Sequence, residues 1–304
     1  MTIDAAAGLR VHEPRPNILA FYDGRAAGRR LYGPQPNWLD DGAYGLGVAS
    51  YAVVDAGEAL VFDTHISLDH ARAVRAELVR RGVRAITVAL SHWHVDHVAG
   101  NAVFADCEII ANAMTCAILG ERRQAIEAGK ASGPPAIRPL VLPTRSFADR
   151  LALRIGGVDV ELRQVDSHSA DGTVAWLPEA RVLLAGDTLE DPITYVAEPD
   201  RLAAHLGGLD LMASWGPEAI LPDHGDEGVI ASGGFGPGLI EANRRYVRRL
   251  LEAAGSAKAD DRPLDDWIAG DVAAGHVRPF APYEAVHRRN LATVMATRAG
   301  RGER

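Results

Sequence analysis

Four side chains able to bind a metal ion lie within six consecutive residues of the chain. They are His92, His94, Asp96 and His97, in the segment SHWHVDHVAG that begins at Ser91. In an extended segment, His92 and His94 would point to the same side, because side chains alternate with a period of two. Neutral imidazoles and carboxylates suit zinc, iron or manganese. The spacing therefore predicts a metal site rather than a solvated histidine-rich loop.

Further metal-binding residue types follow later in the chain, at the ends of apolar runs. His168 lies in DSHSADG, Asp187 ends the run VLLAGD, and His224 lies in LPDHG. Another aspartate, Asp63, ends the earlier run LVFD. Functional residues often sit in loops at strand ends, where a rigid scaffold aims them. Each of these residues alone is a weak signal, and the ordered set is the stronger one.

The HxHxDH segment after an apolar run, followed by His168, Asp187 and His224, resembles the signature of the metallo-β-lactamase superfamily over about residues 48–226. The resemblance implies an α/β fold, the four-layer αβ/βα sandwich, with metals at one edge between two sheets. It also implies a binuclear centre of two divalent ions, with zinc expected and iron or manganese as alternatives. The implied ligands are His92, His94 and His168 for the first metal, Asp96, His97 and His224 for the second, and Asp187 bridging both.

A binuclear centre of this kind would catalyse hydrolysis. Two divalent ions carry four positive charges, which two carboxylates offset only by half, so a bridging water would be present as hydroxide near neutral pH. Asp96 has two conceivable roles, as a metal ligand and as the group that passes a proton to the leaving group, and is the candidate catalytic residue. Asp63 is either a hydrogen-bond partner of a ligand histidine or a strand-end turn former. His65 either sits near the metals or enters the next helix.

The leading functional hypothesis is hydrolysis of a small ester, thioester or lactone, because the seven-residue set is similar to that of glyoxalase II and the acyl-homoserine lactonases. The segment from His168 to Pro178 also resembles the third-ligand region of class B1 β-lactamases, which keeps hydrolysis of a β-lactam or another amide as an alternative. Those enzymes place a cysteine where Asp187 stands, and they lack a ligand equivalent to His97. The alternative from another class is an iron-dependent sulfur dioxygenase, which should need only one metal.

Alternating strands and helices must position these residues. Apolar spacing predicts a helix over Leu68–Arg81, which Gly82 ends, and Gly156-Gly157 predicts a two-residue hairpin. Apolar runs predict strands at 48–55, 59–63, 85–91, 107–111, 151–155, 158–162, 173–177, 181–185 and 219–221. Further helices are expected at 114–128, 239–254, 264–274 and 283–299. We expect an N-terminal arm over 1–45, and one domain over 46–304 that includes the C-terminal helices from about 238.

The overall composition is consistent with a folded enzyme of this kind. The chain has 304 residues, of which 47% are hydrophobic and 24% charged, as is ordinary for a globular protein. A net charge of -8 does not favour nucleic acid. Two cysteines, no signal-like N-terminus and no apolar stretch of about 20 residues point to the cytoplasm. We expect a small-molecule substrate and no nucleic-acid or membrane partner. The C-terminal helices could cap the active site or form a homodimer.

Overall fold

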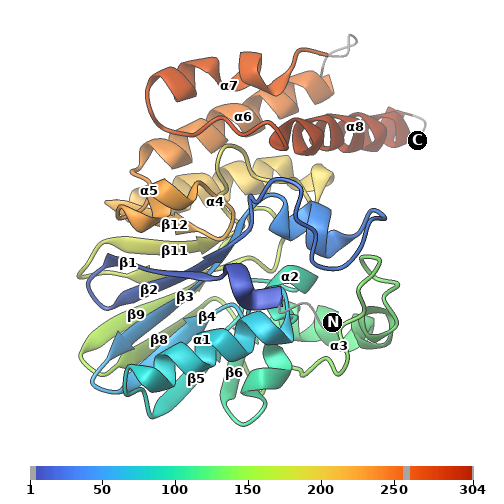
Figure 1. Cartoon of the computed structure of the whole chain (residues 1–304). Coiled ribbons are helices and arrows are strands. Elements are labelled where there is room, and N and C mark those ends of the chain that lie inside the picture. Colours follow the sequence, from blue (N-terminus) through green and yellow to red (C-terminus); the bar gives the residue numbers. More distant parts are fainter. Residues whose placement is uncertain (1–4, 256–260, 303–304) are drawn as a thin grey trace.

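The protein is described by a computed structural model that covers residues 5–255 and 261–302 (Figure 1). Residues 1–4 of the predicted arm, and 256–260 and 303–304 of the predicted domain, lie outside the described residues. The division of the chain at residue 45 stays a prediction. Among the described helices, none combines the length and the apolar character needed to span a bilayer.

Two β-sheets form the middle of the molecule. The first sheet has seven strands in the order β1-β2-β3-β4-β5-β6-β7, and the second has five in the order β12-β11-β10-β9-β8. The first-sheet strands are β1 (Arg10–Arg15), β2 (Ile18–Asp23), β3 (Val48–Asp55), β4 (Glu58–Phe62), β5 (Ala85–Ala89), β6 (Glu108–Asn112) and β7 (Arg145–Phe147). The second-sheet strands are β8 (Arg150–Ile155), β9 (Val158–Gln164), β10 (Thr173–Leu177), β11 (Val182–Gly186) and β12 (Ala219–Pro222).

Helices cover the outer faces of this pair of sheets, as Figure 1 shows. The α-helices are α1 (Leu68–Arg80), α2 (Val95–Val98), α3 (Ala113–Glu127), α4 (Leu202–Ser214), α5 (Glu227–Ala231), α6 (Gly238–Gly255), α7 (Leu264–Ala273) and α8 (Tyr283–Gly302). Short 3-10 or π turns lie at Ala5–Gly8, Trp38–Tyr44, Asn101–Phe104 and Pro199–Arg201. The α6–α8 helices form a group above α4, and α1 and α3 lie on the opposite side (Figure 1). The predicted four-layer sandwich with a helical C-terminal extension is confirmed.

The two faces of β2 show why both sides of the first sheet are covered. Ile18, Ala20 and Tyr22 pack into the core shared with the second sheet. Leu19 and Phe21, which point the other way, pack into the core under α1 and α3. A strand that is apolar on both faces must be buried on both, and the four layers provide this.

Most predicted elements are found within a few residues of their expected bounds. The predicted helix from Leu68 is α1, capped by the Ser67 side chain, which accepts from the backbone N–H of His70. The Gly156-Gly157 hairpin joins β8 to β9 as expected. The sequence did not reveal α4, whose sequence LAAHLGGLDLMAS has two central glycines and no clear polar face. A Cβ at Gly208 would lie 2.9 Å from the backbone oxygen of Asp166, so glycine lets α4 approach the loop that carries His168.

Parallel pairing brings the strand ends together. Strands β4 and β5 are parallel in the first sheet, and β11 and β12 are parallel in the second. The carboxyl ends of parallel strands lie at the same sheet edge, where ligands of open α/β sheets bind. Asp63, Ser91, Asp187 and Asp223 all follow directly, or within two residues, the ends of these four strands. One edge of the sandwich therefore collects residues that lie far apart in the sequence.

Candidate metal centre

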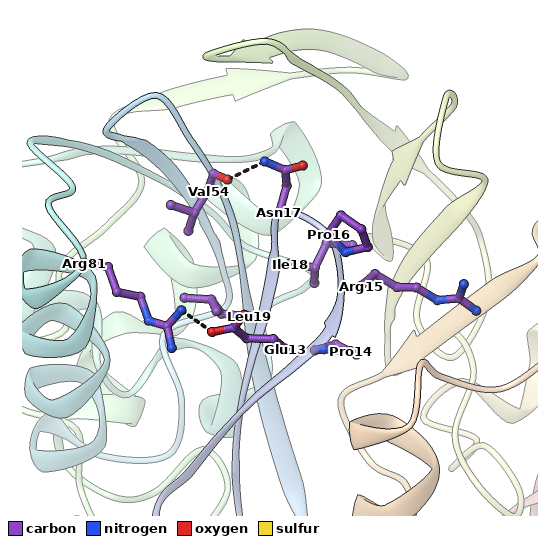
Figure 2. A pocket seen from close by; sticks show the side chains of 9 residues that line it. All are labelled: Glu13, Pro14, Arg15, Pro16, Asn17, Ile18, Leu19, Val54 and Arg81. Carbon is purple, nitrogen blue, oxygen red and sulfur yellow. Dashed lines mark hydrogen bonds and ion pairs between the residues drawn. The ribbon is translucent and has the colours of Figure 1, made fainter.

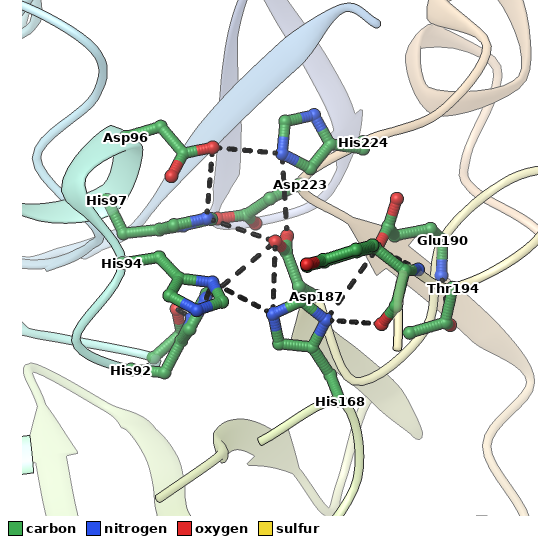
Figure 3. A network of polar contacts seen from close by, with 12 residues as sticks. His92, His94, Asp96, His97, His168, Asp187, Glu190, Thr194, Asp223 and His224 are labelled. Carbon is green, nitrogen blue, oxygen red and sulfur yellow. Dashed lines mark hydrogen bonds and ion pairs between the residues drawn. The ribbon is translucent and has the colours of Figure 1, made fainter. Parts of the chain in front are cut away.

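The seven predicted ligands converge on one point between the two sheets, as Figure 3 shows. They form two groups that share Asp187, and within each group the ligating atoms lie within 4.8 Å of one another. The first group is His92, His94, His168 and Asp187. The second group is Asp96, His97, Asp187 and His224. The structure thus brings together the whole predicted set, while the roles of its members as ligands stay a prediction.

Local backbone conformation explains how one short segment serves both groups. His94 has an extended conformation, with φ and ψ of -62° and 149°. The chain then turns into the short helix α2, which carries Asp96 and His97. The two histidines before this helix belong to the first group, and the two residues within it belong to the second.

The first group is held by closely spaced ring nitrogens. His94 Nδ1 lies 2.8 Å from His92 Nε2 and 3.0 Å from His168 Nε2. Asp187 Oδ2 lies 3.8 Å from each of the same two Nε2 atoms. Three imidazoles and one carboxylate oxygen are a donor set that zinc and similar cations accept.

The second group contains more negative charge. Asp96 Oδ2 lies 3.3 Å from His224 Nε2 and 3.6 Å from His97 Nε2. Asp187 Oδ2 lies 3.2 Å from His97 Nε2, and Asp187 Oδ1 lies 3.7 Å from His224 Nε2. Asp187 Oδ1 therefore faces the second group, while Oδ2 lies near nitrogens of both groups, so this carboxylate is shared by the two groups.

The hydrogen bonds of the outward ring nitrogens identify the inward ones as the candidate metal-binding atoms. His168 Nδ1 lies 2.8 Å from the Tyr195 carbonyl oxygen and His224 Nδ1 lies 2.6 Å from the Gly47 carbonyl oxygen. A carbonyl only accepts, so each Nδ1 carries a proton and each Nε2 is the ring atom that would bind a metal. The buried Asp187 Oδ1 has no hydrogen-bond partner in the described structure. Inward Nε2 atoms and an unpartnered carboxylate oxygen fit a bound cation.

The histidines of the two groups differ in the direction in which their pKa values are shifted. Burial lowers the pKa of His94 to about 3, and it also lowers the pKa values of His92 and His168. Burial acts in the same direction on His224, but the carboxylates of Asp187 and Asp96 outweigh it and raise this pKa to about 10. Without a metal, the three histidines of the first group are therefore neutral at pH 7, and protons in the second group take the place of cationic charge.

Two further carboxylates lie beside the outward ring nitrogen of His97. Its Nδ1 lies 2.9 Å from Asp63 Oδ2 and 3.1 Å from Asp223 Oδ2. Asp63 Oδ1 also accepts from the backbone N–H of Ser91, at 2.7 Å. Asp63 thus has the predicted role of orienting a ligand histidine. Asp223 was not predicted, although its position between Pro222 and His224 at a strand end could have suggested it.

The C-terminal helices reach the centre through the loop after β11. Tyr283 of α8 donates to Glu190 Oε2 at 2.8 Å, and Glu190 Oε1 accepts from the Tyr195 N–H at 2.8 Å. Tyr195 in turn holds His168 through its carbonyl. Asn243 of α6 and Asn290 of α8 bind backbone groups of the same loop. No sequence motif marks these residues, because each is a single polar side chain in an apolar pattern.

His65 lies close to the centre but belongs to neither group. It is buried, has a positive φ of 67°, and stacks on His70 with ring centroids 4.5 Å apart. Its Nδ1 accepts from the backbone N–H of Ile66. The residue therefore shapes the turn that enters α1.

The centre is mostly buried. Most of the seven ligands are buried, and among them only His94 and Asp96 are partly exposed. Trp93 and Tyr195, whose rings contact those of His94 and His168, are also partly exposed. Solvent therefore reaches the centre past these side chains. Asp96 is the carboxylate of the centre that is best placed to exchange a proton with the entrance.

A separate groove of about 690 Å³ lies beside the β1–β2 turn, as Figure 2 shows. Its cations are already engaged, because Arg81 pairs with Glu13 and Arg15 donates to the Gly233 carbonyl. None of the seven predicted ligands lines it. The lining residues are Glu13, Pro14, Arg15, Pro16, Asn17, Ile18, Leu19, Val54 and Arg81.

Comparison with known proteins agrees with this fold. Residues 43–229 match the family model of the metallo-beta-lactamase superfamily, and the chain belongs to this superfamily of metal-dependent hydrolases. A linear primary-alkylsulfatase of Pseudomonas sp. (strain ATCC 19151) is 26% identical, over 50% of this chain and 38% of that protein. The chain thus spans well under half the length of this relative.

Solved structures support the fold alone, because their identities are low. DIM-1 metallo-beta-lactamase exposed to ceftazidime is 19% identical, covers 79% of this chain and 97% of its own, and has a TM-score of 0.57. A metallo-beta-lactamase from Pontibacter korlensis is 14% identical, covers 79% and 99%, and has a TM-score of 0.58. The C-terminal helices α6–α8 lie beyond the residues that match the family model.

Proposed function

We propose that the chain is a binuclear metal-dependent hydrolase that cleaves a small ester, thioester or lactone. The observation that carries the proposal is the pair of ligand groups that share Asp187, with the imidazole Nε2 atoms directed inward. When bound, two divalent cations, zinc in the first place, would acidify a water and polarise a carbonyl oxygen. The seven side chains named above would hold them.

The residues of the chain would supply orientation and proton transfer. Asp63 and the Tyr195 carbonyl fix the rings of His97 and His168 through their outward nitrogens. Asp96, partly exposed at the entrance, would hold a proton and deliver it to the departing alkoxide.

Hydrolysis of a sulfate ester is a second candidate, because part of the chain is similar to a linear primary-alkylsulfatase. The two candidates differ in the bond that breaks. In a carboxylic ester the carbonyl carbon is attacked and the acyl product takes up oxygen from water. In a sulfate ester, cleavage releases inorganic sulfate and an alcohol.

The test is activity of the metal-loaded protein on a panel of carboxylic esters, thioesters, lactones, alkyl sulfates, β-lactams and phosphodiesters, together with elemental analysis. We expect two zinc equivalents per chain and turnover of carbonyl substrates. Sulfate release from alkyl sulfates, without turnover of carbonyl substrates, would favour the second candidate. A fully active protein with one tightly bound metal would contradict the binuclear proposal and favour a mononuclear dioxygenase.

A further inference from the structure

Two arginines cover the aromatic rings at the entrance to the centre. The guanidinium carbon of Arg122, on α3, lies 4.4 Å from the centre of the Trp93 ring. The Trp93 ring in turn lies 4.7 Å from the ring of His94. The guanidinium carbon of Arg289, on α8, lies 5.2 Å from the Tyr195 ring, which lies 5.9 Å from His168. Each cation is thus separated from a predicted metal ligand by a single aromatic ring.

The two arginines come from different helices, α3 and α8. In Figure 1, α8 lies above α2 and α3 lies below it. Both arginines are exposed, whereas the rings beneath them are partly buried. An aromatic face attracts a guanidinium and restricts its motion, so each cation is held beside the entrance before any substrate arrives.

Neither guanidinium forms an ion pair with a carboxylate of the described residues. In the described part of the chain, no Asp or Glu oxygen lies within 4.0 Å of Arg122 or Arg289. Their direct neighbours differ, because Arg123 pairs with Glu127 at 3.3 Å and Arg288 pairs with Glu284 at 2.6 Å. In a chain with 40 acidic and 32 basic residues, acidic partners are abundant. The two cations beside the entrance are therefore free to bind oxygen atoms of a ligand.

We propose that Arg122 and Arg289 form an anion subsite, and that the substrate is an ester or thioester that carries a carboxylate outside its scissile bond. This inference rests on the proposed hydrolytic function. The planar guanidinium matches a carboxylate with paired hydrogen bonds. A net charge of -8 repels anions at long range, so selection of an anionic substrate requires local cations at the entrance.

The subsite predicts a preference between two substrates that differ only in charge. Mono(4-nitrophenyl) glutarate and 4-nitrophenyl pentanoate share the leaving group and have acyl chains of similar length, and only the first has a terminal carboxylate. For the metal-loaded full chain, we expect kcat/KM to be roughly tenfold higher for the glutarate ester, through a lower KM. Added salt should reduce this preference.

Arg122→Gln and Arg289→Gln should each remove most of the preference, by raising KM for the glutarate ester and leaving the pentanoate ester within about twofold. The matched controls are Arg123→Gln and Arg288→Gln, which remove a cation from the adjacent position of the same helix. The controls should keep the preference. Equal metal content across the variants shows that loss of the preference does not come from a disturbed centre.

A calorimetric titration with glutarate separates this inference from the hydrolytic proposal. If neither ester is cleaved, the hydrolytic proposal fails, and the subsite is still judged by whether Arg122→Gln and Arg289→Gln weaken glutarate binding while the controls do not. A wild-type protein that shows no preference for the charged ester, or variants that retain that preference and bind glutarate as tightly as the wild type, would overturn the anion subsite.

Discussion

The two ligand groups of the candidate metal centre are supported by different kinds of partner. In the first group, the outward nitrogens of His92 and His168 meet uncharged oxygens, from the Ser91 hydroxyl and the Tyr195 carbonyl. In the second group, His97 is backed by two carboxylates. The two groups share Asp187, so they differ in Asp96, which belongs to the second group alone, and in the carboxylates beside His97.

This difference decides what each group holds when no metal is bound. Buried carboxylates stabilise any nearby cation, whether a proton or a metal. The second group therefore binds protons in place of a metal, and the histidines of the first group stay neutral. A metal that enters the second group must displace protons from charged imidazoliums, whereas one that enters the first meets neutral imidazoles.

Removal of the shared carboxylate should have the largest effect. We expect Asp187→Ala to fold but to lose metal from both groups and to lower turnover by several orders of magnitude, because only this side chain faces both groups. Elemental analysis and single-turnover rates measure the two effects. A variant with near wild-type rate and metal content would show that the groups do not depend on a bridge.

Asp96→Asn should cost about 10² to 10⁴ in rate for substrates whose leaving group needs a proton. Alkyl esters and lactones release a basic alkoxide, so they should suffer more than nitrophenyl esters or thioesters. The comparison must be made at matched metal occupancy, because an emptied second group would slow every substrate alike. An equal loss across leaving groups, with both metals bound, would leave Asp96 as a ligand only.

The supporting residues allow the two groups to be compared directly. Asp63→Asn keeps the shape of the side chain but removes its charge, and should weaken metal binding at the second group by about 10- to 100-fold. The matched change in the first group, Ser91→Ala, removes an uncharged partner of His92 and should weaken binding less. Chelator competition measures both. A larger loss of metal affinity in Ser91→Ala than in Asp63→Asn would contradict the expected difference between the two groups.

Metal affinity should depend on pH at one group more than at the other. His224 has its pKa raised to about 10 by Asp187 and Asp96 against the effect of burial, so it binds a proton at pH 7. Affinity of the second group should therefore rise about tenfold per pH unit for each displaced proton up to that pKa. Titrations in buffers of different ionisation enthalpy count the protons. Equal proton release by both equivalents would contradict the electrostatic difference.

The smallest effect is expected from Tyr283→Phe. This change removes the hydroxyl that binds Glu190 and leaves the packing of α8 intact. We expect metal affinity at the first group to fall a few fold, because the Glu190–Tyr195 link to His168 loosens. Arg245→Gln, which breaks an ion pair with Asp271 inside the C-terminal helices, is the control and should leave metal binding unchanged. An equal change in both variants would indicate a general effect on the extension.

The ligands could be predicted from the sequence because metal sites demand particular residue types at strand ends. Six residues from His92 to His97 contain four of them, and the remaining three follow apolar runs that read as strands. The supporting residues could not be found in this way. Glu190 and Tyr283 are 93 positions apart, and their contact depends on how the C-terminal helices pack.

Helix α4 shows a different limit of sequence analysis. Its two glycines lower the intrinsic helix propensity, and its exposed face includes Ala203, Gly207 and Leu211, so few polar side chains mark it as a helix. Tertiary packing overrides both signals. Gly208 is one of the two glycines that lower the helix propensity, and it also lets α4 lie against the loop that carries His168.

The family match ends at residue 229, but hydrogen bonds join the loop behind His168 to the C-terminal helices beyond it. Asn243, Tyr283 and Asn290 supply hydrogen bonds to the buried Glu190, Thr194 and Val196 of the loop behind His168. Each polar group left buried without a partner would cost about 1–3 kcal/mol, a large share of the stability of a typical domain. Truncation at the family boundary should therefore destabilise the lactamase-like core itself. The intact chain should melt in one transition rather than as a core followed by an appendage.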